Sequence, residues 1–330
     1  MKRLVFALSA AIVSAMCVCC SSADRYVTSD GAILGTTFHI SAKVRGVTPA
    51  EIYAAMSELD AEMKASMSIF DSTSLISRVN RGLTDSLDSH LRFNLEMARA
   101  IGEKCDCRYD VTVEPLTEAW GFASKHAACR PNVDSLLQFV GYDKWRIEGD
   151  RVVKSDPRVR FDLNSIAKGY TVDRAAAILE EMGAENYIVE IGGEIRCRGV
   201  NATGDTWRVG IDTPFEGNMS PGADLYATVR LKDRSLATSG NYRRFYIDGD
   251  GRKIVHTIDP RTGRGTVSRL LSATVVTDDC ITADALATMF MVVGADDAIK
   301  MAESMRDSVS VYFILDDGKD GYEIFKTIDM

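Results

Sequence analysis

Asp284 and Thr288 are the two side chains whose types and spacing most directly suggest chemistry. They are four positions apart in a segment with a helical pattern, so they share one face of the predicted helix. A carboxylate and a hydroxyl stacked in this way offer hard oxygen ligands, which suit Mg²⁺ better than a soft metal. The alternative is structural, because an acid near a helix N-terminus is also favoured by the helix macrodipole.

A second segment, residues 162–170, predicts the end of a strand, a turn and the start of a helix. Backbone N–H groups at the start of a helix are ready donors to a phosphate group. Lys168, one turn into the helix, would add a point charge on the same phosphate. A solvated lysine on an ordinary capped helix is the alternative.

Two further segments place polar groups beside aromatic or rigid neighbours. Asp110 follows Tyr109, and an acid beside an aromatic ring can hydrogen-bond a heterocycle. The alternation of Val111 and Val113 predicts the start of a strand, so an edge strand with a capping acid is the alternative. His256 is predicted on the return strand of a hairpin, just before an Asp-Pro-Arg-Thr-Gly turn. A lone histidine in a strand more often has a structural role, but this position favours contact with a ligand more than usual.

Composition limits the classes of partner that these groups can serve. The chain has 330 residues, of which 46% are hydrophobic and 26% charged, and its net charge is −8. A negative field argues against nucleic acid as a partner and against attraction to an anionic membrane surface. The sequence contains four histidines and no paired CxxC motifs, which argues against a zinc site.

The N-terminus predicts export. Lys2 and Arg3 precede a short apolar run and small residues, a pattern typical of a secretory signal over residues 1–20. Cys17, Cys19 and Cys20 at its end resemble a bacterial lipoprotein processing site, with plain signal-peptidase cleavage as the alternative. We therefore expect a signal over 1–20, a polar tether over 21–30 and one catalytic domain over 31–330.

The predicted elements give the α+β class, because strands and helices do not alternate in a strict βαβ rhythm. Thr48 and Glu51 form a capping box before a helix that continues to about residue 65. The other predicted helices span about 91–101, 166–182, 282–293 and 296–306. The predicted strands comprise a hairpin over 145–153, a strand over 158–161, a strand-rich region over 187–276 and a final hairpin pairing 309–315 with 322–327.

Taken in order along the chain, these segments resemble one family, the ApbE flavin transferases. The motifs that carry the resemblance span residues 34–294 and occur in the family's order: Gly35-Thr36-Thr37-Phe38, the 67–80 segment, Tyr109 to Val113, Asp162 to Asp173, Ile191 to Ile195, Ala237 to Tyr242, His256 to Gly263 and Ala283 to Thr288. The resemblance implies a single two-lobed, T-fold-like α+β unit with antiparallel sheets, packed helices and an FAD cleft between the lobes.

The resemblance also implies roles for individual residues. FAD contacts fall on Leu34, Phe70, Arg108, Tyr109, Asp110, Asp162, Lys168 and Ile258. Leu34 stands where the family commonly has methionine, and Phe70 where it often has tyrosine. Mg²⁺ would be held by the Ser165 carbonyl, Asp284 and Thr288. Ala287 replaces a second acid found in some members, which leaves open whether one metal or two bind. His256 is the candidate base, with Asp284 as its rival.

The implied activity is that of an FAD:protein FMN transferase, in which FMN moves from FAD to a Thr or Ser hydroxyl of a target protein and AMP is released. The targets of such enzymes are flavoproteins of membrane redox complexes or extracytoplasmic electron carriers. The expected location is the periplasmic side of the bacterial cell membrane, with a lipid anchor at Cys17, Cys19 or Cys20. Two alternatives stay open: an FAD pyrophosphatase that releases FMN and AMP, and a non-catalytic flavin-binding lipoprotein.

Overall fold

The computed structural model describes residues 25–123, 131–216, 218 and 222–328. Its described residues contain one large sheet of eight strands, in the order β1-β2-β5-β6-β9-β14-β15-β16, with every neighbouring pair antiparallel. These strands are β1 (Arg25–Ile33), β2 (Thr36–Val44), β5 (Asn186–Ile191), β6 (Glu194–Arg198), β9 (Ser235–Gly240), β14 (Leu270–Thr277), β15 (Ser310–Asp316) and β16 (Tyr322–Lys326).

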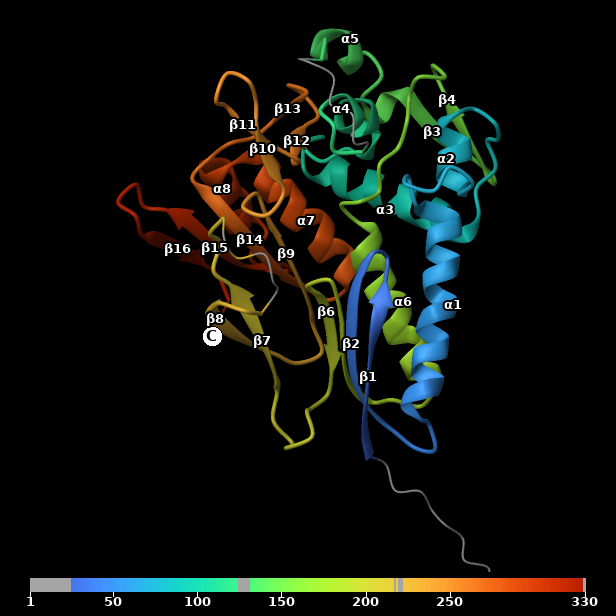
Figure 1. Cartoon of the computed structure of the whole chain (residues 1–330), viewed down its shortest axis with the longest axis vertical. Helices are drawn as coiled ribbons and strands as arrows, with labels where there is room; N and C mark the ends of the chain where they lie inside the picture. Colours follow the sequence, from blue (N-terminus) through green and yellow to red (C-terminus); the bar gives the residue numbers. More distant parts are fainter. Residues whose placement is uncertain (1–24, 124–130, 217, 219–221, 329–330) are drawn as a thin grey trace, which may run out of the picture.

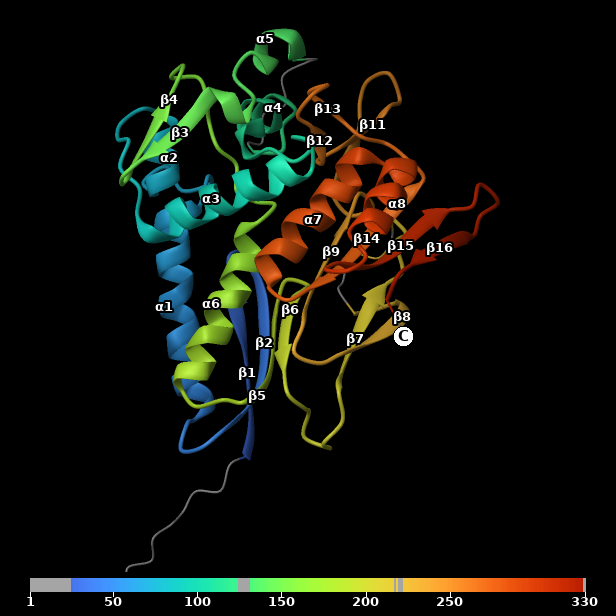
Figure 2. The ribbon, with the colours of Figure 1, turned by 180° about the vertical axis from the view of Figure 1, so that it is seen from behind.

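Helices cover one face of this sheet (Figures 1 and 2). The long ones are α1 (Pro49–Met67), α3 (Ser89–Lys104), α6 (Ala167–Glu181), α7 (Cys280–Val293) and α8 (Ala295–Ser304). Alternate residues of β5, namely Tyr187, Val189 and Ile191, are buried in the core that these helices share with the sheet. Strand side chains alternate between the two faces, so the intervening residues, including Ile188 and Glu190, point away from the helices.

The opposite face is partly covered by a hairpin of β7 (Trp207–Asp212) and β8 (Leu225–Leu231). Trp207, Val209 and Ile211 alternate inward from β7 and join a second apolar core with Ile195 and Leu236 of the sheet. This hairpin pairs with no other strand among the described residues.

Shorter elements form a second lobe above the sheet, at the top of Figure 1. A small apolar cluster of Leu116, Val133, Val140 and Ile258 lies within it. The elements concerned are α2 (Leu75–Asn80), η1 (Val111–Val113), α4 (Glu114–Ala119), α5 (Val133–Leu137), η2 (Tyr142–Lys144), β3 (Trp145–Glu148), β4 (Arg151–Lys154), β10 (Phe245–Ile247), β11 (Lys253–Val255), β12 (Ile258–Asp259) and β13 (Arg264–Gly265). The predicted α+β class with two lobes is therefore confirmed.

Most predicted helices and hairpins form where the local signals placed them. Thr48 accepts a hydrogen bond from the Glu51 N–H, and the Glu51 carboxylate accepts one from the Thr48 N–H, which completes the capping box of α1. The hairpin of β3 and β4, the helices α6, α7 and α8, and the final hairpin of β15 and β16 also match their predicted places to within about two residues.

Two predicted strands are wrong, and in each case a polar side chain determines the backbone instead. Residues 111–113 form the short helix η1, because Asp110 accepts hydrogen bonds from the N–H (2.8 Å) and hydroxyl (2.6 Å) of Thr112 and turns the chain. Residues 158–161 form no strand. Asn80 instead donates to the Phe161 carbonyl and accepts from its N–H, both at 2.8 Å, in place of a ladder.

The N-terminal predictions meet the structure only in part. Residues 25–30, expected in a polar tether, belong to β1, where they pair with β2 in regular antiparallel register. The predicted signal over 1–20 and its cysteines lie outside the described residues. Within the described ranges, no helix is long and apolar enough to cross a membrane.

Candidate functional site

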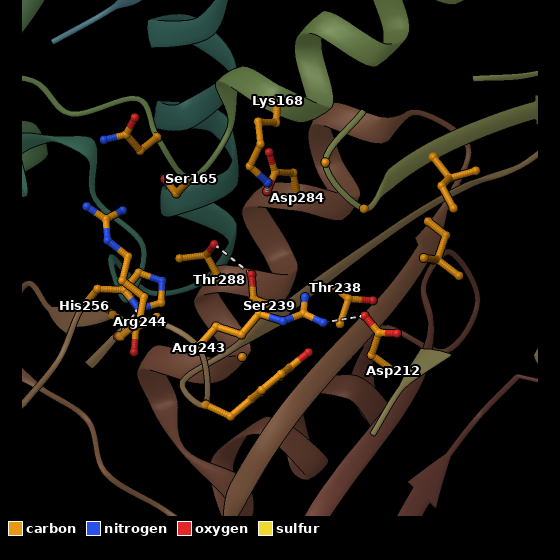
Figure 3. A pocket seen from close by; sticks show the side chains of 18 of the residues that line it. Ser165, Lys168, Asp212, Thr238, Ser239, Arg243, Arg244, His256, Asp284 and Thr288 are labelled. Carbon is orange, nitrogen blue, oxygen red and sulfur yellow. Dashed lines mark hydrogen bonds and ion pairs between the residues drawn. The ribbon is translucent and has the colours of Figure 1, made fainter. Parts of the chain in front are cut away.

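A pocket of about 770 Å³ lies where β9, the start of α6, one face of α7 and the chain after β11 meet (Figure 3). Ligand pockets in proteins commonly have this size. It brings together ten of the twelve residues that the sequence singled out: Arg108, Tyr109, Asp110, Asp162, Ser165, Lys168, His256, Ile258, Asp284 and Thr288.

The two exceptions, Leu34 and Phe70, do not line this pocket. Leu34 occupies the tight turn between β1 and β2 with a φ of 51°, and its N–H donates to Asp60 Oδ1 at 2.7 Å. Phe70 lies between α1 and α2 and is 63% exposed. The FAD contacts that the resemblance implies for these two residues therefore stay predictions.

The starts of α6 and α7 are joined by carboxylates. Asp284 on α7 accepts the Gly169 N–H of α6 at 2.9 Å, while Asp173 on α6 accepts the N–H groups of Cys280 and Ile281 at 3.0 and 2.9 Å. Each helix thus satisfies unpaired N–H groups in the first turn of the other. The anion at the start of α6 is consequently the Asp284 carboxylate, in the place where the sequence predicted a phosphate.

Gly169 is required by this close approach. A Cβ atom at this position would lie 2.4 Å from the Cys280 carbonyl oxygen and 2.8 Å from Asp284 Cβ. The absence of a side chain at one residue of α6 therefore fixes where the Asp284 carboxylate stands in the pocket.

Lys168 also faces carboxylates rather than the open pocket. Its ammonium forms an ion pair with Glu194 and lies 4.0 Å from Asp284 Oδ1. Burial alone would lower the pKa of Lys168, but the charges of Asp284 and Glu194 outweigh it and raise that pKa. Burial raises the pKa of Glu194, against the effect of Lys168. Lys168 is charged, because two carboxylates flank its ammonium.

The oxygens gathered here fit a small divalent cation. Asp284 supplies a nearly fully buried carboxylate, Thr288 a hydroxyl on the same face of α7, and Ser165 a backbone carbonyl in the loop before α6. In the described part of the chain no group of three or more His, Cys, Asp or Glu residues could hold a metal ion. A cation at this place would therefore depend on neutral oxygens besides Asp284, an arrangement that Mg²⁺ accepts when phosphates complete its shell. Ala287 is buried and adds no carboxylate.

Ser239 and Thr238 are pocket residues that the sequence did not single out. The hydroxyls of Ser239 on β9 and Thr288 share a hydrogen bond of 3.2 Å (Figure 3). The hydroxyl of Thr238 shares one of 2.9 Å with that of Thr274 on the neighbouring strand. Ser239 therefore orients the hydroxyl that a metal would use. Its only signal in the sequence was its place within the Ala237 to Tyr242 motif.

His256 lies just after β11, outside the strand predicted for it. Its Nδ1–H donates to the Arg244 carbonyl at 3.1 Å, which leaves the Nε2 lone pair free. Burial, and after it the positive charge of Arg244, lowers the pKa of His256 from 6.5 to about 4. At neutral pH the ring is therefore an uncharged acceptor in the pocket wall, edge-on to the ring of Phe122.

The remaining predicted residues build a polar wall on the other side. The hydroxyls of Tyr109 and Ser165 share a hydrogen bond of 2.9 Å, and the Asp162 carboxylate accepts a hydrogen bond from the Asn164 N–H at 2.9 Å. Burial raises the pKa of Asp110 to about 6 and also raises that of Asp162. Arg108 reaches the pocket while paired with Asp297 of α8.

At the far end of the pocket Arg243, also missed from the sequence, ties three segments together. It donates to Asp212 at the end of β7 (2.6 Å) and to the Asn218 carbonyl (2.8 Å), and its guanidinium stacks on Tyr242. The sequence signal that could have identified this end of the pocket is the pair of adjacent arginines, Arg243 and Arg244, in a chain of net negative charge.

Comparison with known proteins agrees with this arrangement. A model of the ApbE family matches residues 34–313. Proteins named FAD:protein FMN transferase from Haemophilus influenzae and Vibrio cholerae are 31% and 33% identical to the chain; the first alignment covers 96% of this chain and 94% of the relative, the second 91% of each.

Solved structures agree as well. The flavin transferase ApbE from Vibrio cholerae superposes with a TM-score of 0.80 at 30% identity, covering 92% of this chain and 97% of that one. The Pseudomonas stutzeri flavinyl transferase ApbE, in its apo form, superposes with a TM-score of 0.81 at 26% identity, covering 92% of this chain and 95% of that one. The extent of these matches, together with the ordered motifs and the pocket that unites them, shows that the chain belongs to the ApbE family.

Proposed function

We propose that this protein transfers the FMN part of FAD to a Thr or Ser hydroxyl of another protein and releases AMP. The relatives of similar length named FAD:protein FMN transferase support this proposal. The observation that carries it is the single pocket in which Asp284, Thr288 and the Ser165 loop lie together with a neutral His256. This combination provides a place for a charged phosphate group and an acceptor for a proton.

The proposed reaction is a single nucleophilic displacement at phosphorus. The acceptor hydroxyl oxygen forms a bond to the FMN-side phosphorus, the bond from that phosphorus to the AMP phosphate oxygen breaks, and AMP leaves with the electron pair. Mg²⁺, when bound, would neutralise charge on the phosphate oxygens. His256 Nε2 is the candidate acceptor of the hydroxyl proton, because its Nδ1–H is already committed to a carbonyl. A nearby diphosphate would raise the pKa of His256 from its low value towards neutrality.

The cofactor, the location and the partners are parts of the same proposal. The buried Asp284 carboxylate and the Thr288 hydroxyl support Mg²⁺ as the metal. The basic and apolar residues of the first twenty positions and the cysteines at 17, 19 and 20 support export and a lipid anchor. Flavoproteins of membrane redox complexes and extracytoplasmic electron carriers are the acceptors that such a location would supply.

The test is incubation with FAD, MgCl₂ and a purified flavin-accepting domain of an extracytoplasmic electron carrier. The proposal expects fluorescent flavin on the denatured acceptor and one AMP for each flavin attached. The matched control is Asp284→Asn, which keeps an oxygen for the Gly169 N–H but removes the charge; it should abolish transfer. Free FMN with unlabelled acceptor would show a hydrolase, and unchanged FAD would show binding alone. Either result would contradict the proposal.

A further inference from the structure

Within the described residues, the hairpin strand β7 pairs along one edge only. The Thr213 N–H, just beyond β7, donates to the Asp224 carbonyl at 2.9 Å, on the side of β8. The register shift near Ile211 adds its extra residue to β8, so the alternation along β7 is unbroken. Backbone groups alternate between the two edges of a strand, so those of residues 208, 210 and 212 point away from β8. No described strand pairs with them.

This edge forms one wall of the functional pocket. Arg208, Gly210 and Asp212 all line the pocket, and Ile188 and Glu190 of the large sheet lie on its floor. In both views of the ribbon β7 lies between β8 and β6, so its free edge faces the part of the sheet that the hairpin leaves open (Figures 1 and 2). The C-terminal end of β7 is held by Arg243, on the side where Figure 3 shows Thr238 and Ser239.

The outward face of the hairpin carries an uncompensated basic pair. Arg208 on β7 stands directly opposite Arg230 on β8, and both are exposed. Like charges in facing positions destabilise a sheet. Within the described ranges neither arginine forms an ion pair, although the whole chain carries a net charge of −8. Asp212, the nearest acid on β7, is already paired with Arg243. This pair therefore favours a partner with carboxylates.

We propose that the acceptor protein binds here as an extended acidic segment that adds a strand to the free edge of β7. Backbone hydrogen bonds to residues 208, 210 and 212 hold the segment, and its carboxylates face Arg208 and Arg230. The wall formed by β7 leads the segment into the pocket, so its Thr or Ser hydroxyl reaches the phosphate site beside Thr288. This inference rests on the proposed transfer reaction and identifies the surface that selects its acceptor.

The test measures two constants for each variant: the KM for the purified flavin-accepting domain used above, and the Kd for FAD from flavin fluorescence. Arg230→Glu reverses a charge outside the pocket lining, and we expect the acceptor KM to rise about tenfold or more with an unchanged FAD Kd. Lys232→Glu is the matched control, because Lys232 is exposed just after β8 and does not line the pocket. It should leave both constants near those of the wild type.

A second comparison separates edge pairing from charge. Arg208→Ala and Arg208→Pro both remove the guanidinium, but only proline removes the outward N–H, and it leaves the ladder with β8 intact. The proline variant should raise the acceptor KM about threefold beyond the alanine variant. Higher ionic strength should raise the KM of the wild type but not that of Arg230→Glu.

The outcomes distinguish this inference from the proposed function. If the wild type flavinylates the acceptor and all four variants have the same acceptor KM as the wild type, the docking surface is overturned and the transfer reaction still stands. A raised FAD Kd in Arg230→Glu would assign the arginines to nucleotide binding instead, and equal KM values for Arg208→Pro and Arg208→Ala would overturn the added strand. Absence of transfer by the wild type would refute the reaction itself.

Discussion

Gly169→Ala offers the sharpest test of how the pocket is built, because the usual effect of this substitution is reversed. Alanine in a helix is normally more stable than glycine by about 1 kcal/mol. Here the added Cβ would lie 2.4 Å from the Cys280 carbonyl oxygen and 2.8 Å from Asp284 Cβ. Both clashes involve atoms that cannot rotate away, so α6 and α7 must separate.

The size of the effect combines steric overlap with the loss of one hydrogen bond. Overpacking of a tight interface costs about 1–3 kcal/mol, and breaking the bond from the Gly169 N–H to the Asp284 carboxylate costs about 1.5–3 kcal/mol. After the gain in helix propensity is subtracted, we expect a net loss of about 1.5–5 kcal/mol in the free energy of unfolding. In a chain of this length the Tm should fall by roughly 2–7 °C.

The assay is thermal unfolding followed by circular dichroism, together with the Mg²⁺ dependence of transfer. The variant should require more Mg²⁺ than the wild type, because the carboxylate that moves is the candidate ligand. Gly249→Ala is the control: it has nothing within 4 Å of its added Cβ and should leave both measurements unchanged. A Tm equal to or above that of the wild type would refute the reasoning that α6 and α7 are held at contact by this glycine.

Three other perturbations test separate parts of the structure. Ser239→Ala removes the partner of the Thr288 hydroxyl at 3.2 Å, and a titration of transfer rate against Mg²⁺ should show about tenfold weaker apparent affinity with little change in Tm. His256 is neutral in the folded chain, whereas the unfolded chain protonates it below pH 6.5. The wild type should therefore lose about 2–3 kcal/mol of stability as the pH falls from 6.5 to 4, and His256→Gln should lose less in denaturant titrations across that window. Asn80→Ala leaves the N–H and carbonyl of Phe161 without partners in a buried place, and urea unfolding should show a loss of about 2–4 kcal/mol; a loss below about 1 kcal/mol would mean that another group or water replaces Asn80.

Local signals in the sequence were sufficient for the elements whose cause is local. The capping box at Thr48 and Glu51 positions α1, and the spacing of Asp284 and Thr288 places both on one face of α7, because the helix repeat alone dictates it. Ten of the twelve selected residues line one pocket. Their residue types and short motifs marked them in the sequence, whereas long-range packing brings the motifs together.

The two incorrect strand predictions have the same physical cause, a polar side chain whose hydrogen bonds to the backbone replace the expected strand. Asp110 does this locally, through the N–H of Thr112. Asn80 satisfies Phe161 from 81 positions away and so replaces a strand. Leu34 and Phe70 do not line the pocket, and their contacts with FAD stay predictions.

The sequence by itself determined the family, the chemistry of the oxygen ligands and the places of the main helices, because these depend on residue type and near-neighbour spacing. Only the tertiary structure decided which partner each of these polar groups has. It directs Lys168 to Glu194 and Asp284 and assigns the start of α6 to a carboxylate. It also leaves one edge of β7, beside the pocket, without a partner among the described strands. These outcomes depend on which helix or strand lies opposite, and long-range packing determines that.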